Sequence, residues 1–299
     1  MKRKIITISA LVLALMVVNT VTFAQKAWVN TSLGVSNYKG DLDAGYTPSF
    51  KPAFSLGASY DITYRYRLRL NFTQMSVHGD DTKATAAGVA DRKLNFKTNI
   101  SELSLLGEFD LLDNLYNSVI PYVFAGVGVY HFNPKPETPI NGVDVNLHDL
   151  GTEGQNLSSG KYADRKYSLT QLNFQFGGGI RFELNESTSL SLEANYRRLF
   201  TDYLDDVSAG SYVPASEWAA DIPSNPTAAT AQQYNWRGDG AVPKTIYAKR
   251  GDPSHNDTYY TFQIRLNFRL NNMFLGDDLY SPRNPSGRGQ LRCGNRMYY

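Results

Sequence analysis

Hydrophobic and polar residues alternate in the segment TFQIRLNFRL, residues 261–270, where five apolar side chains share one face and two arginines lie on the other. A period of two is that of a β-strand whose faces meet different surroundings. In a soluble sheet the apolar face packs on a protein core. In an outer-membrane barrel it faces lipid, and the polar face lines the lumen. One strand fits both structures, so the rest of the chain has to discriminate between them.

The same pattern predicts about eight strands, an even number as in bacterial barrels. The fourth strand changes phase along its length, since the apolar positions near Leu94 alternate out of step with those of 103–109, and we expect a bulge near Ile100. The fifth is apolar on both faces, and Gly126 and Gly128 indicate close packing there. The predicted strands are residues 27–37, 52–61, 65–75, 94–109, 121–132, 172–184, 188–200 and 261–270.

The connections between these strands alternate in length. Short segments join strands two to three, four to five and six to seven, whereas the others are long. Short turns on one side and long loops on the other are typical of outer-membrane barrels, whose long loops are extracellular. A β-sandwich has no reason to alternate in this way, so we favour an all-β, transmembrane, antiparallel up-and-down β-barrel in the outer membrane. The long connections are roughly residues 38–51, 76–93, 133–167 and 201–257.

The two ends of the chain differ from the barrel. Residues 1–24 have a basic start, a short apolar stretch and small residues before Ala24, which predicts a secretory signal peptide rather than a membrane-spanning helix. No later apolar run is long enough for a transmembrane helix. The barrel then takes residues 25–270, and the Gly-, Pro- and Arg-rich segment 271–299 is expected to be a periplasmic tail.

The polar faces of the strands carry charges of both signs. A barrel of about eight strands is only wide enough for side chains to fill its lumen. Buried charges must pair, because an unpaired one is strongly penalised. We therefore expect a closed ion-pair network, which favours a scaffold over a pore. Its predicted members are Arg67, Arg69, Glu102, Glu108, Arg181, Glu183, Glu193, Arg197, Arg265 and Arg269.

Composition argues against several further classes of function and site. The net charge of +2 argues against a nucleic-acid binder, which concentrates basic residues on one face. The single cysteine, Cys293, excludes an intramolecular disulfide, although pairing with another chain stays open. Glycine clusters such as FAGVGVY and GGG lie inside strands, where they indicate bends or close packing rather than a dinucleotide site.

Few residues suggest chemistry, and we expect no enzymatic activity, no cofactor and no metal. The four histidines share no metal-ligand spacing. A lipid-modifying hydrolase would need a serine and an acid beside His131, at a barrel rim, and nothing in the sequence places them there. The clustered carboxylates of TDYLDDVS (201–208) are of the kind that binds divalent cations. Because no EF-hand spacing appears, we favour the interpretation that they are solvated loop residues. The histidines are His78, His131, His148 and His255.

Four segments together carry a resemblance to a known family: PYVFAGVGVYHFNP (121–134), LHDLGTEGQ (147–155), GGGIRFEL (177–184) and YRRLFTDYLDDVS (196–208). In this order they resemble the PorG-like family, an outer-membrane β-barrel component of the type IX secretion system of Bacteroidetes. The family motifs fall on two long loops, where packing between loops is favoured over contact with a partner. The matching residues are Gly151, Thr152, Glu153, Gly154, Gln155, Thr201, Asp202, Tyr203, Leu204, Asp205 and Asp206.

The resemblance implies a non-enzymatic component of the cell outer membrane that contacts outer-membrane lipid and associates with a periplasmic ring of the lipoprotein PorK and its partner PorN. The periplasmic turns and the tail would form the contact, with an acidic partner docking on the tail arginines. A tail without any partner is the alternative for this segment. For the whole chain the alternative is a passive OmpA-like or OmpW-like barrel, serving envelope integrity or small apolar solute passage. The tail arginines are Arg283, Arg288, Arg292 and Arg296.

Overall fold

The computed structural model describes residues 27–42, 49–84, 89–112, 117–240 and 249–270, so the predicted signal peptide and tail lie outside the described residues. Eight strands form its framework. They alternate polar and apolar side chains over lengths that suffice to cross a bilayer at a tilt. The strands are β1 Ala27–Lys39, β2 Lys51–Asp61, β3 Tyr66–Asp80, β4 Asn95–Asp110, β5 Val119–His131, β6 Thr170–Asn185, β7 Thr188–Leu199 and β8 Thr258–Arg269.

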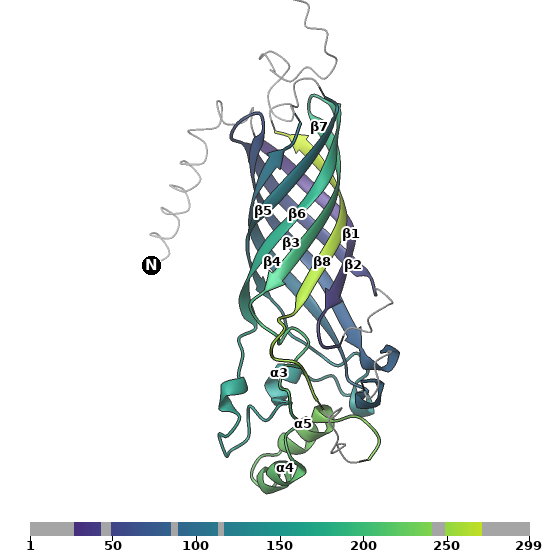
Figure 1. Cartoon of the computed structure of the whole chain (residues 1–299), viewed down its shortest axis with the longest axis vertical. Helices are drawn as coiled ribbons and strands as arrows, with labels where there is room; N and C mark the ends of the chain where they lie inside the picture. The colour runs from purple at the N-terminus through teal and green to yellow at the C-terminus, as the bar shows by residue number, and fades with distance from the viewer. Residues whose placement is uncertain (1–26, 43–48, 85–88, 113–116, 241–248, 271–299) are drawn as a thin grey trace, which may run out of the picture.

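The strands form one closed antiparallel barrel in which each pairs with its neighbours in sequence, and β8 closes on β1 from Trp28↔Arg269 to Lys39↔Thr258. The predicted all-β, up-and-down, eight-stranded barrel is therefore confirmed. Figure 1 shows the connections after β2, β4 and β6 at one end, which we call the turn end, and the long connections at the other, the loop end.

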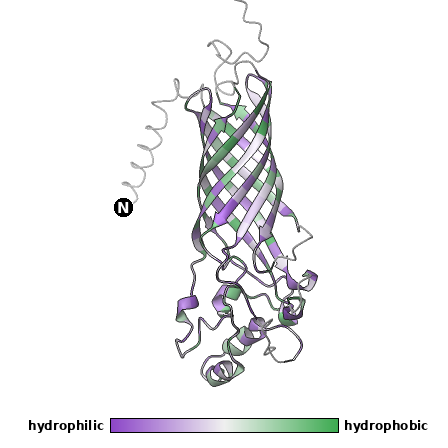
Figure 2. Ribbon diagram, viewed as in Figure 1, coloured by the Kyte–Doolittle hydropathy of each residue, from purple (hydrophilic) through white to green (hydrophobic). Residues whose placement is uncertain are grey.

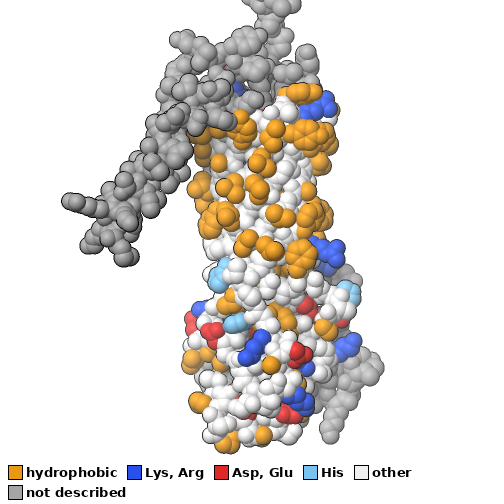
Figure 3. Space-filling view, turned by 90° about the vertical axis from the view of Figure 1, so that its left-hand side faces the viewer, with side chains coloured by type: hydrophobic (Ala, Val, Ile, Leu, Met, Phe, Trp, Pro, Cys, Tyr) orange, Lys and Arg blue, Asp and Glu red, His pale blue; other side chains and the backbone are white. Residues whose placement is uncertain are grey.

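Apolar side chains face outward over the middle of the barrel wall. Leu70, Phe72, Leu103, Leu105 and Ile264 are each between about 45% and 55% exposed. Figure 3 shows this apolar band on the visible face of the barrel, with most charged side chains of that face beyond it, and Figure 2 shows hydrophilic and hydrophobic residues mixed along the strands. A closed barrel satisfies every backbone group internally, so it can expose such a band to lipid. The protein is an outer-membrane β-barrel.

Short helices and 3-10 turns lie at the loop end (Figure 1). None of the described helices has the length and apolar character needed to cross a membrane. They are η2 Asp81–Lys83, η3 Ala90–Arg92, η4 Ile140–Gly142, α3 Leu147–Leu150, η5 Ala163–Arg165, α4 Ala215–Asp221 and α5 Ala228–Asn235.

The bulge expected near Ile100 is wrong. β4 pairs without a register shift from Asn95 to Asp110, and its inward face runs from Phe96, Thr98 and Ile100 to Glu102. The phase change in the sequence arises because, from Asn95 to Asp110, the inward side chains change from apolar to polar. The outward side chains change from polar to apolar over the same length, as the strand enters the lipid. The one register shift among the described strand pairs lies instead between Glu183 and Asn185 of β6.

An apolar core fills the loop end of the barrel, and we call it the loop-end core. It joins inward side chains of the strands to side chains of the long loops, and Tyr38 meets Phe96 edge to face at 4.9 Å. Its strands extend past the outer apolar band, which is why β3 runs to Asp80 rather than ending near residue 75 as predicted. The core is built chiefly from Tyr38, Met75, Val77, Phe96, Ile100, Tyr130, Phe132, Leu147, Leu199, Leu204, Val207, Tyr234 and Tyr259.

Candidate functional site

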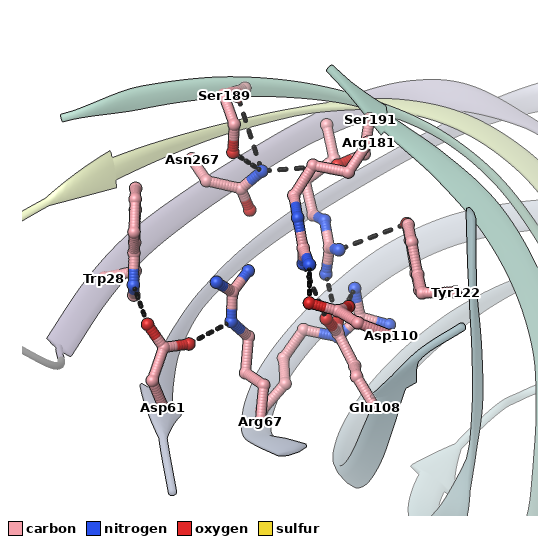
Figure 4. Close-up of polar contacts among 12 residues, drawn as sticks. Trp28, Asp61, Arg67, Glu108, Asp110, Tyr122, Arg181, Ser189, Ser191 and Asn267 are labelled. Carbon is pink, nitrogen blue, oxygen red and sulfur yellow. Dashed lines mark hydrogen bonds and ion pairs between the residues drawn. The ribbon is translucent and has the colours of Figure 1, made fainter. Parts of the chain in front are cut away.

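Ion pairs cross the lumen in the turn-end half of the barrel, and Glu108 lies at their centre (Figure 4). Its Oε1 is 2.8 Å from Arg69 Nη1 and 2.7 Å from Arg265 Nη1, and its Oε2 is 3.6 Å from Arg181 Nη1. Arg69 also lies 2.7 Å from Glu193, whose carboxylate accepts a hydrogen bond from Tyr122 at 2.9 Å. These groups come from six strands, β3 to β8, so the network links the wall across the lumen.

The remaining predicted network residues lie on both sides of this centre. Arg197 pairs with Glu102 at 3.2 Å, and Tyr259 donates to the same carboxylate at 2.7 Å. Glu183 lies 3.2 Å from Arg181 Nε. The guanidinium of Arg269 lies 4.7 Å from the centre of the Trp28 ring. The structure thus places all ten predicted residues toward the barrel interior.

Sequence reasoning missed two carboxylates of this network. Asp61 lies 2.6 Å from Arg67 and also accepts from Trp28 Nε1 at 2.8 Å, and Asp110 pairs with Arg181 (Figure 4). With them, the six arginines named here face six carboxylates, so the charge balances. Each of these residues is the last of its strand. Each lies an even number of positions from the strand's other inward polar residues, so its side chain also points inward. Extending the alternation to the last strand residue would have found them.

Space for these side chains is left by inward glycines. A Cβ on Gly128 would lie 2.5 Å from Gln175 Nε2 and 2.6 Å from Asn173 Oδ1. Both amides are buried, and Asn173 donates to Glu102 at 2.7 Å. The glycine of β5 therefore allows the polar layer to cross the lumen. The interior is closed by ion pairs in one half and by the loop-end core in the other.

Beyond the loop-end core, away from the barrel, two long loops pack together into a unit that we call the loop cap. It comprises the β5–β6 loop (132–169) and the described parts of the β7–β8 loop (200–240 and 249–257). Glu153 is fully buried there. Its carboxylate accepts from the backbone amides of Ser208 and Ala209 at 3.0 Å and lies 3.2 Å from Arg250 Nε. One side chain thus fixes the path of the neighbouring loop.

The two family-motif segments meet around this carboxylate. Tyr203 donates to Glu153 at 3.2 Å, Thr152 donates to Asp206, and Tyr167 donates to Asp206 at 2.7 Å. Gly151 and Gly154 have φ of +68° and +87°, the left-handed region that favours glycine. The arrangement agrees with the packing between loops that we expected, and every motif residue except the half-buried Tyr203 is buried.

The acidic motif residues are not solvated, so that interpretation is wrong. Asp205 and Asp206 are 1% exposed, and Asp202 is 6% exposed. They are buried because the loops fold over the barrel mouth, which periodicity does not reveal. Tyr38 of β1 donates to Asp205 at 2.6 Å or to Asp257 at 2.9 Å, and the amide of Leu204 donates to Asp257 at 2.9 Å.

These buried carboxylates favour protons. Burial, with the negative charges of Asp257 and Asp41 nearby, raises the pKa of Asp202 to about 9. Burial likewise raises the pKa of Asp257 to about 8, against hydrogen bonds from Tyr38 and Leu204 that lower it. The pKa of Asp205 is raised by burial and by Asp257. Within the described residues no group of three or more His, Cys, Asp or Glu side chains is placed to hold a metal ion.

The histidines do not gather. His131 contacts Thr170 at 3.0 Å, His148 packs on Tyr167, and His255 contacts Asp252 at 2.9 Å in an exposed turn. The serine and acid considered for His131 are not hydrogen bonded to it in the described structure. His78 instead has both, since Ser49 and Glu137 contact its two ring nitrogens. Sequence reasoning missed this group because its members come from three separate segments.

Comparison with known proteins finds one family model and several solved outer-membrane barrels that are similar to this chain. Residues 4–148 match the family model described as "Domain of unknown function (DUF6089)". A search of curated proteins gives no match. Solved structures with a similar barrel include Neisserial surface protein A, with a TM-score of 0.40 and 9% identity over 81% of this chain and 96% of that one.

Two further solved structures are similar to the same extent. The outer membrane protein OprG from Pseudomonas aeruginosa has a TM-score of 0.40 and 11% identity, over 81% of this chain and 95% of that one. The attachment invasion locus protein Ail of Yersinia pestis has a TM-score of 0.37 and 10% identity, over 81% and 97%. At these values the likeness is one of barrel architecture and says nothing about activity.

Proposed function

We propose that this protein is an anchoring component of type IX protein secretion, which links the outer membrane to a periplasmic ring of the PorK and PorN type, a role that needs no enzymatic activity. The observation that carries the proposal is the closed interior. Ion pairs around Glu108 fill one half of the lumen, and the loop-end core fills the other. A barrel without a free lumen acts through its surfaces, as a scaffold does.

The motif residues add support to the secretion role. The segments 147–155 and 196–208, which resemble the PorG-like family, form one interlocked unit through Glu153 and Asp206. Their burial assigns them to the architecture of the loop cap and leaves the turn end and the tail for partners. In this role the barrel holds and positions the ring, which requires no catalysis.

The proposed contact is electrostatic. The tail arginines Arg283, Arg288, Arg292 and Arg296 are spaced along a short segment, and an acidic surface on the ring would attract them. Such a contact weakens as salt rises, because screening shortens the range of the attraction. With the turn end in the periplasm, β8 ends on the side of the ring.

An affinity pull-down from native membranes tests this function. The tagged full chain is compared with a chain lacking 271–299, and with one in which the four tail arginines are replaced by glutamine. Recovery of the ring lipoprotein and its partner with the full chain, and their loss with both variants, is the expected result. Recovery of the barrel alone, with secretion intact in a deletion strain, would overturn the proposal and leave the passive barrel.

A further inference from the structure

Three side chains from separate segments meet on the outer wall near the loop end. His78 lies on the outward face of β3, on the same parity as Phe72, and is covered so that it is 7% exposed. Its Nδ1 lies 2.9 Å from Oε2 of Glu137, and its Nε2 contacts the hydroxyl of Ser49. Ser49 precedes β2, His78 lies near the end of β3, and Glu137 follows β5. The pairing of strands in the barrel wall brings them together.

The connectivity fixes the role of each nitrogen. An ionised carboxylate only accepts hydrogen bonds, so Nδ1 carries the imidazole proton toward Glu137. Nε2 is then the free acceptor for the hydroxyl proton of Ser49. An acid that orients an imidazole, which in turn accepts from a serine, is the arrangement that activates a hydroxyl as a nucleophile.

The serine is held at the edge of the apolar band. Its neighbour Phe50 is 48% exposed, and the Phe50 ring meets the ring of lipid-facing Phe262 edge to face at 6.5 Å. The backbone amide of Ser49 donates to Asn37 Oδ1 at 3.2 Å, and Asn37 donates to Tyr260 at 2.6 Å. Histidine side chains lie just beyond the loop-side edge of the band (Figure 3). A lipid ester is therefore the compound that this position meets.

One lysine contacts the three residues, and two more lie on backbone segments paired next to them. Lys51 Nζ lies 3.6 Å from Glu137 Oε1. Lys97 is the partner of His78 in the β3–β4 ladder, and its backbone bridges to Lys135 beside Glu137. An ammonium here would bind the phosphate of an anionic lipid headgroup and stabilise negative charge that develops on an ester oxygen.

We propose that Ser49, His78 and Glu137 form a hydrolytic triad that cleaves carboxylic esters of anionic membrane lipids at the loop-side surface of the membrane. Ser49 Oγ bonds to the ester carbonyl carbon while its proton passes to His78 Nε2. The carbon–oxygen bond to the alcohol then breaks, and the leaving oxygen takes that proton. Water, deprotonated by His78, attacks the acyl-serine, releasing the carboxylic acid and restoring Ser49. Glu137 is the positioning residue.

This activity goes beyond the secretion role and is independent of it. The triad lies at the loop end, whereas the proposed ring contact is at the turn end and the tail. Deleting 271–299 leaves all three triad residues in place. An experiment can therefore refute either proposal without refuting the other.

Release of fatty acid from phosphatidylglycerol tests the proposal, with the purified full chain in mixed micelles. The wild-type chain is expected to release fatty acid above the protein-free background. Ser49→Ala and His78→Gln are expected to lower the rate about a hundredfold or more. Two matched controls should keep the rate: Ser76→Ala, whose hydroxyl contacts Asn99, and His131→Gln, which contacts Thr170.

Two further measurements separate chemistry from folding. A fluorophosphonate should form an adduct on the peptide that contains Ser49, found by mass spectrometry, and the adduct should be absent in His78→Gln. Glu137→Gln should slow release and shift its pH profile, which a merely structural role would not do. Folding of each variant is checked by its heat-sensitive mobility in gels. A folded wild-type chain with neither release nor adduct overturns the triad, as does full activity in folded Ser49→Ala.

Discussion

Arg250 and Glu153 form a buried ion pair, with Nε 3.2 Å from Oε1, that joins the segment before β8 to the loop before β6. The same guanidinium donates to Thr152 at 2.8 Å and to the carbonyl of Asp206 at 3.2 Å. Both motif segments and the start of the last strand therefore depend on one pair of charges. This pair therefore joins three segments of the loop cap.

Glu153→Ala should loosen the loop cap while leaving the barrel folded. The substitution strands the buried Arg250 charge and removes the acceptor of two backbone amides, which costs about 3–5 kcal/mol. Hydrogen exchange should rise across 200–209 and around residue 152, with β1–β8 unchanged. Glu217→Ala is the matched control, because the Lys161–Glu217 pair lies at the surface, where an ion pair contributes little to stability. Equal exchange in the two variants would contradict the role of Glu153.

Glu108→Gln should destabilise the barrel itself. This carboxylate contacts Arg69, Arg181 and Arg265, and its neutralisation leaves three buried guanidiniums short of negative charge. We expect a loss of about 3–5 kcal/mol in the free energy of unfolding. Guanidinium titration of the chain in lipid vesicles measures it.

Glu183→Gln serves as the comparison for the lumen network. This carboxylate contacts one network arginine, Arg181, at 3.2 Å and lies toward the turn end of β6, where its side chain is 9% exposed. Its loss should therefore be smaller than that of Glu108→Gln. A larger loss for Glu183→Gln would show that the centre of the network is not at Glu108.

The loop cap should lose stability as pH rises. Burial raises the pKa of Asp202 to about 9 and that of Asp257 to about 8, both above the ordinary value near 4. The folded cap therefore binds more protons than the unfolded loops, so the stabilisation is full below about pH 4 and falls as pH approaches 9. Fluorescence of the buried Trp218 during denaturant titration at pH 5, 7 and 9 follows the cap.

Asp202→Asn tests the source of this dependence. An amide at this position stays neutral, so the variant should flatten the decline between pH 5 and pH 9. Asp252→Asn is the control, since its carboxylate lies in an exposed turn and its pKa is lowered to about 2 by hydrogen bonds from Ser254 and His255. If both variants keep the wild-type slope, another group causes it.

Alternation of residue types was sufficient to predict the eight strands and ten of the twelve charged residues of the network, all but Asp61 and Asp110, because a closed barrel gives every strand the same two environments. It failed at Ile100, where the interior itself changes from ion pairs to an apolar core. It also missed Tyr38 and Arg250 as partners of the motif residues. The long loops have no period, so their contacts follow from tertiary packing that one sequence does not encode locally.

The outward side chains of β4 change between polar and apolar along the strand, and this change predicts where the strand leaves the lipid. In a Cys293→Ser background, single cysteines at Lys97 and Leu103 probe two outward positions of one strand. Lys97 lies beyond the apolar band and should react with an aqueous maleimide, whereas Leu103, 52% exposed on the band, should be shielded by lipid. Labelling of Lys97→Cys on intact cells by a reagent that does not cross the outer membrane would place the loop end outside. Equal labelling of both cysteines would contradict the position of the band, and labelling of Lys97→Cys only in lysed cells would reverse the orientation on which the periplasmic contact depends.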